Sequence, residues 1–162
     1  LDRPLLITKL DLEGWNTVGH DPCLLGSVLL RCPSLTWLSL ANTGLTDDAV
    51  CSLSTCFKFL QDSSGGQLAK LNLRGNKISP IGCEAIARNF FPKASVQQKV
   101  AGSQAALQNK PYCLDLGQNS PIRDLGAAVL ANELKAQGCL GSLLLRDCNL
   151  TATGFASLAV AA

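Results

Sequence analysis

Aromatic residues and histidine are scarce in this chain of 162 residues, and its net charge is small. Only 5% of the residues are aromatic, His20 is the one histidine, and 14 basic against 12 acidic residues leave a net charge of +2. This near balance gives no reason to expect nucleic acid or a membrane surface as a partner. Because 47% of the residues are nevertheless hydrophobic, leucine and alanine must fill the core.

Several motifs of membrane insertion and catalysis are also missing. No apolar run approaches the 18 residues of a membrane span, and no charged segment precedes a signal-like apolar stretch. The segment 63–66 (SSGG) lacks both the lysine and the preceding strand of a phosphate-binding loop. We therefore expect no membrane partner and no nucleotide cofactor.

The possible catalytic and metal-binding residues are isolated from one another. His20 lies in a Gly-His-Asp-Pro turn and is best interpreted as a solvated loop residue. There is no Cys-x-x-Cys pair, and Cys51 with Cys56 and one distant histidine makes a poor zinc site. The sequence predicts no enzymatic activity, no metal, no cofactor and no small-molecule substrate.

Leucine is abundant, and it recurs in one repeated phrase, L-x-x-L-x-L-x-x-N/C/T-x-L. The clearest copies occupy 35–53, 68–86 and 140–158, a fourth occupies 113–130, and a blurred first copy occupies 7–15. The leucines at the fourth and sixth places alternate with polar residues, which predicts a short strand with one buried face. These pairs are Leu38/Leu40, Leu71/Leu73, Leu114/Leu116 and Leu143/Leu145.

The second half of each copy predicts a turn followed by a helix. The ninth place carries a side chain that can hydrogen-bond where the chain leaves the strand: Thr43, Asn76, Asn119 or Cys148. Thr46, Ser79 and Thr151 then suit helix N-caps, and Pro80 suits a first helical position. Small residues recur three positions after the cap, where they would let neighbouring helices approach closely: Ala49, Gly82, Gly126 and Gly154.

This recurring phrase resembles the leucine-rich repeat family, in the long helical class typified by ribonuclease inhibitor. The string 31–35 (RCPSL) with Cys51 and Cys56 also resembles the cysteine-containing repeats of F-box proteins, but the predicted helices fit the first class better. The resemblance implies an α/β leucine-rich-repeat solenoid, or horseshoe, with a parallel β-sheet on its concave face and α-helices on its convex face.

The spacing of the fourth-place leucines predicts the domain organisation. Leu10 to Leu38 is 28 residues and Leu114 to Leu143 is 29, whereas the two intervals between them are 33 and 43. We predict a single domain over 1–162 with five repeats at about 7–34, 35–67, 68–110, 111–139 and 140–162. An insertion at about 89–111 forms either a short extra helix or a loop. The first copy is interpreted as an irregular or capping repeat. Because the chain begins with Leu1 rather than Met and ends inside a predicted helix without a cap or a polar outer face, we interpret it as a segment of a longer protein.

The candidate binding site is the exposed face of the sheet. Trp37, at a third place, is the predicted anchor, because aromatic residues and arginine dominate interface energetics. The alternative is that Trp37 packs beneath the first repeat. The predicted partner-binding residues on the concave face are Trp37, Lys70, Asn72, Arg74, Asp115 and Arg146.

The sequence thus predicts a non-catalytic protein-interaction module or scaffold of a larger intracellular protein. Cysteines in the core-facing positions of the repeats indicate reduced thiols and a cytoplasmic location. The resemblance leaves other functions open. They are a structural subunit of a large ciliary or cytoskeletal assembly, a GTPase-activating module, and the sensor region of an innate immune receptor.

Overall fold

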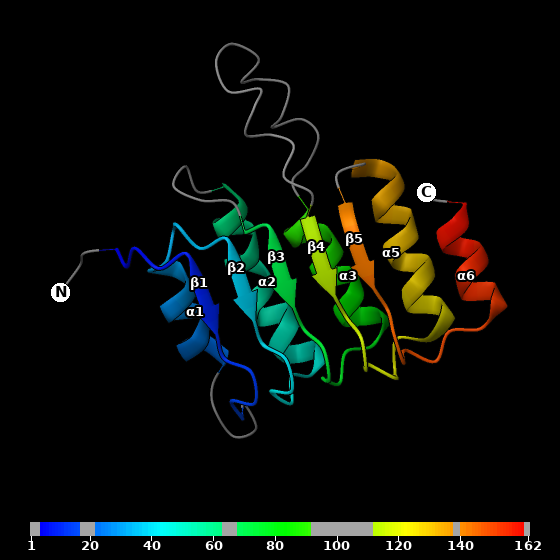
Figure 1. The fold of residues 1–162 in the computed structure, drawn as a ribbon, viewed down its shortest axis with the longest axis horizontal. Coiled ribbons are helices and arrows are strands. Elements are labelled where there is room, and N and C mark those ends of the chain that lie inside the picture. The colour runs from blue at the N-terminus through cyan, green and yellow to red at the C-terminus, as the bar shows by residue number, and fades with distance from the viewer. Residues whose placement is uncertain (1–3, 17–21, 63–67, 92–111, 138–139, 161–162) are drawn as a thin grey trace, which may run out of the picture.

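A computed structural model describes residues 4–16, 22–62, 68–91, 112–137 and 140–160. Strands and helices alternate along it: β1 Lys9–Asp11, α1 Pro22–Leu30, β2 Trp37–Ser39, α2 Asp47–Asp62, β3 Lys70–Asn72, α3 Pro80–Phe90, β4 Tyr112–Asp115, α5 Arg123–Gln137, β5 Leu140–Leu144 and α6 Ala152–Ala159. The strands form one parallel sheet in sequence order, and the helices form a second layer behind it (Figure 1). The predicted leucine-rich-repeat solenoid is confirmed.

The fourth-place leucines lie in one line across the sheet. Leu38 pairs in register with Leu10 and Leu71, and Leu71 pairs with Leu114. The side chains of Leu38, Leu71 and Leu114 are at most 1% exposed, because each is covered by repeats on both sides. Leu143 is only partly buried, since no strand of the described chain lies beyond β5.

Ninth-place side chains connect successive turns, as their positions predicted. Asn76 Oδ1 accepts hydrogen bonds from the backbone N–H of Thr43 and Leu45, at 3.2 and 2.9 Å. Its Nδ2 donates to the carbonyls of Leu40 and Leu73, at 2.8 and 2.9 Å. One buried amide therefore satisfies backbone groups of two neighbouring repeats, which strand pairing leaves without partners.

Each turn also places its eighth residue in the left-handed region. The φ angles range from 55° to 74° at Gly14, Asn42, Gly75, Gln118 and Asp147. At Gly75 a Cβ atom would overlap Asn42 Oδ1, so a larger residue there would have to displace the Asn42 side chain. Asn42, Gln118 and Asp147 show that residues other than glycine also adopt this bend. The structure thus reveals a backbone bend that recurs in all five described turns and that the sequence pattern alone did not indicate.

The helices follow the predicted caps in two repeats and differ in a third. The hydroxyls of Ser79 and Thr151 accept the N–H of Ile81 and Thr153, each at 3.3 Å. Thr46 precedes α2 and forms an isolated bridge with Lys77. The small residues three positions after the caps are all buried at helix contacts, as predicted: Ala49, Gly82, Gly126 and Gly154.

One aromatic cluster joins the two ends of the predicted insertion at about 89–111. Phe90 ends α3, and its ring contacts those of Phe91 and Tyr112 at centroid distances of 5.3 and 5.9 Å. All three side chains are buried. This cluster brings the start of β4 to the end of α3. The rest of the predicted insertion, 92–111, lies outside the described residues, as do His20 and the segment 63–66.

Candidate protein-binding face

The concave face of the sheet carries three rows of side chains, one from each of the third, fifth and seventh places of the repeats. Register pairing places Lys9 beside Trp37, Trp37 beside Lys70, Lys70 beside Cys113 and Cys113 beside Ser142. We call this line the third-place row. The strands lie in front of the helices, and no described element covers this side of them (Figure 1).

Trp37 is half-buried in the third-place row, between two exposed lysines. Lys9 and Lys70 make no ion pair with any residue that the structure describes. The row therefore presents a large aromatic side chain flanked on both sides by positive charge. This arrangement suits recognition of a partner that has apolar and acidic groups close together.

The fifth-place row is largely occupied by hydrogen bonds within the protein. The carboxylates of Asp11 and Asp115 accept the N–H two residues later, of Glu13 at 3.0 Å and of Gly117 at 2.9 Å. Asn72 Oδ1 accepts the Arg74 N–H in the same way, at 3.1 Å. These side chains cap the ends of their strands, a function that the sequence analysis did not assign to them.

Three positions on this face are more buried than the alternation of a strand predicts, and one of them is Ala41 at a seventh place, which is 1% exposed. The Ser39 hydroxyl, at a fifth place, accepts a hydrogen bond from Asn72 Nδ2 at 3.3 Å, and Ser39 is 1% exposed. Gly117, at a seventh place, is enclosed by Asp115 and the backbone of Arg146. Because these small residues are covered by longer neighbouring side chains, they are not accessible to a partner. The fifth-place and seventh-place rows are therefore interrupted at these positions.

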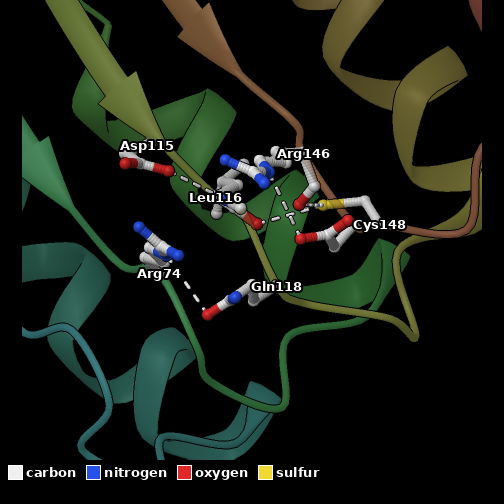
Figure 2. Close-up of polar contacts among 8 residues, drawn as sticks. Arg74, Asp115, Leu116, Gln118, Arg146 and Cys148 are labelled. Atoms are coloured by element: carbon white, nitrogen blue, oxygen red, sulfur yellow. Dashed lines mark hydrogen bonds and ion pairs between the residues drawn. The ribbon is translucent and has the colours of Figure 1, made fainter.

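The seventh-place row contains the predicted arginines. Arg74 Nε donates to Gln118 Oε1 at 3.1 Å, and the Gln118 backbone N–H donates to the Arg146 carbonyl at 2.6 Å (Figure 2). Arg146 Nε lies 3.5 Å from Asp147 Oδ2, and both side chains are mostly exposed. Gln118 thus connects Arg74 to the backbone of the repeat that carries Arg146.

The six predicted residues therefore divide into three groups. Trp37 and Lys70 are neighbours in the third-place row, Asn72 and Asp115 are strand caps, and Arg74 and Arg146 lie at the ends of their strands. The prediction omitted Lys9 and Gln118. The first copy of the repeat, 7–15, already places Lys9 at a third place, but Lys9 was not included in the predicted set.

The buried thiols of this fold are structural rather than reactive. Burial raises the pKa of the Cys83 thiol to about 12 and also raises that of Cys148. The Cys148 thiol donates to the Leu116 carbonyl at 3.1 Å, so it replaces the ninth-place asparagine. Within the described ranges, no three histidine, cysteine or acidic side chains are placed to hold a metal ion.

Comparison with known proteins supports the repeat class. Residues 68–87 match the family model described as Leucine Rich repeat. No curated protein sequence matches the chain. None of the described helices has the length and apolar character that a membrane crossing requires.

Solved structures share this fold at low sequence identity. The C-terminal domain of tropomodulin from Caenorhabditis elegans aligns with a TM-score of 0.60 and 12% identity, over 96% of this chain and 81% of that domain. Actin-Binding Site 2 of leiomodin-1 aligns with a TM-score of 0.57 and 18% identity, over 95% of this chain and 78% of that one. The chain thus has a leucine-rich-repeat fold of the ribonuclease-inhibitor-like type, with a tropomodulin-like arrangement of its repeats.

Proposed function

We propose that this chain is a non-catalytic, protein-binding module of an actin-based cytoskeletal assembly in the cytoplasm. The observation that carries the proposal is the open concave face, where Trp37, Lys70, Arg74 and Arg146 are presented on a rigid sheet. Rigid elements hold such side chains in place before binding, which lowers the entropic cost of association.

The choice of actin is supported by one of the similar structures. The leiomodin-1 domain is described as an actin-binding site, and its fold follows 95% of this chain. A fold alone does not determine function, so actin is part of the proposal and requires a direct test. Burial of Cys32, Cys56, Cys83 and Cys148 as small core residues accords with a reducing compartment.

The test is binding to purified actin. We expect the protein to co-sediment with filamentous actin or to bind monomeric actin in a titration followed by anisotropy. The matched control is the Leu71→Asp variant, which we expect to be unfolded and therefore inactive. If the folded wild-type protein binds neither form of actin at micromolar concentrations, the assignment to an actin assembly is wrong.

A further inference from the structure

We propose that Lys9, Trp37 and Lys70 bind an extended acidic peptide segment that crosses the strands, with one apolar side chain against the tryptophan and a carboxylate at each lysine. This inference rests on the proposed function as a protein-binding module, and it specifies the chemistry of the partner. The three residues belong to β1, β2 and β3 and lie in one register line.

The distance between the strands determines how far apart the two acidic residues of the ligand must be. Neighbouring strands lie about 4.8 Å apart, so Lys9 and Lys70 are roughly 10 Å apart at their backbones. An extended peptide advances about 3.3 Å per residue and its alternate side chains share one face, so residues i and i+4 lie about 13 Å apart with residue i+2 midway between them on the same face. The ligand is therefore a segment with one apolar residue at its centre and an acidic residue two positions to either side, within reach of the two long lysine side chains.

Charge explains why the segment follows this row. Neither lysine has an ionic partner among the described residues, so both are available to a carboxylate. Asp11 and Asp115 lie in the neighbouring fifth-place row and would repel an acidic segment that moved toward it. The acidic side chains of the sheet thus confine the peptide to the third-place row.

The tryptophan supplies most of the affinity in this arrangement. A half-buried indole on a polar surface provides contact area at low entropic cost, and such residues dominate interface energetics. Arg74 and Arg146 are four places further along their strands, about 13 Å from the third-place row. We infer that they contact the body of the partner rather than this segment.

The experiment uses an acetylated peptide with two glutamates four positions apart, a leucine midway between them and a serine on each side of the leucine. In a Trp15→Phe background Trp37 is the sole tryptophan, so its emission reports binding directly. We expect Trp37→Ala to weaken binding about 30-fold by calorimetry, and Trp37→Phe to retain most of the affinity. Lys70→Gln should weaken binding several-fold, and a peptide with glutamine in place of both glutamates should bind weakly.

The matched control is Lys58→Gln, which removes an exposed lysine from α2 on the convex side. Circular dichroism checks the fold of each variant. If Trp37→Ala unfolds the protein, the double variant Lys9→Gln/Lys70→Gln provides the test instead. Equal affinities for Lys70→Gln and Lys58→Gln, or no preference for glutamate over glutamine peptides, would overturn this inference.

The two proposals fail in different ways. If actin binds the wild-type protein and the Trp37→Ala variant equally, the third-place row is wrong and the cytoskeletal function stands. If the acidic peptide binds as described but actin does not, the site is correct and the partner is a different acidic protein.

Discussion

The carboxylate of Asp47, at the start of α2, caps the beginning of the following helix, α3, through Ser79. Asp47 Oδ1 accepts the Ser79 N–H at 2.8 Å and the Gly82 N–H at 3.0 Å. Asp47 Oδ2 accepts the Ser79 hydroxyl at 2.5 Å. One acidic side chain thereby satisfies helix N–H groups of the next repeat, where the helix dipole also favours negative charge.

This contact explains why the third residue after the cap is small. A Cβ atom on Gly82 would lie 2.5 Å from Asp47 Oδ1, so any larger residue would displace the carboxylate. The same arrangement joins Asp124 of α5 to Thr151 at the start of α6. In α3 the corresponding first position is Pro80, which has no carboxylate to offer to the next repeat.

The first prediction concerns this capping. Asp47→Ala leaves the N–H groups of Ser79 and Gly82 without their acceptor, so we expect a loss of about 1 to 2 kcal/mol in the free energy of unfolding. Urea denaturation followed by circular dichroism measures the change. Asp48→Ala is the matched control, because its side chain is exposed on the same turn. Equal losses for both variants would show that the contact between repeats contributes nothing.

Acid should weaken the equivalent contact at the other end of the solenoid. The Thr151 hydroxyl and N–H, which both donate to Asp124, hold the pKa of its carboxyl below the usual 3.8. The folded state therefore binds a proton at Asp124 less readily than the unfolded state does. The stability that this contact contributes is fully present above pH 3.8, and it is lost as the pH falls through the lower pKa of Asp124 in the folded state. We expect the difference in Tm between the wild type and Asp124→Asn to shrink between pH 5 and pH 3. A difference that stays constant over this range would contradict the prediction.

A charge in the leucine line should destabilise the protein according to its position. Leu71 is 1% exposed between two strands, so Leu71→Asp buries a charge without a partner and costs about 3 to 5 kcal/mol, enough to unfold the domain. Leu143, in β5, is only partly buried, so Leu143→Asp should cost less and leave a folded protein. Thermal unfolding distinguishes the two, and a larger loss at Leu143 would refute this explanation.

Thiol labelling provides a fourth test. Burial raises the pKa of Cys83 to about 12, so its thiolate is nearly absent at pH 8 and the side chain is inaccessible. We expect mass spectrometry to show no modification of Cys83 in the native protein after brief exposure to iodoacetamide. The exposed Cys23 should react within the same time. Modification of Cys83 before Cys23 would indicate that α3 does not pack as described.

Much of the fold was predictable because the local sequence of each repeat predicts its own strand, turn and helix. Leucine alternation placed the strands, and the N-caps Ser79 and Thr151 fell where predicted. The site was less predictable. Asn72 and Asp115 were assigned to binding from their places in the phrase, yet both hydrogen-bond their own strand ends. Such local hydrogen bonds depend on the bend at the eighth residue, which the leucine pattern does not encode.

The sequence by itself determined the repeat, its register and the alternation of strand and helix, because these follow from local periodicity and from burial of leucine. Only the tertiary structure decided which side chains became neighbours. Lys9, Trp37 and Lys70 are 28 and 33 residues apart along the chain, and parallel pairing of three strands brings them into one line. Likewise, Phe155 is 63% exposed, whereas Val50, Cys83 and Ala127 at the same helical position are fully buried, because each of these three lies against the helix of a following repeat.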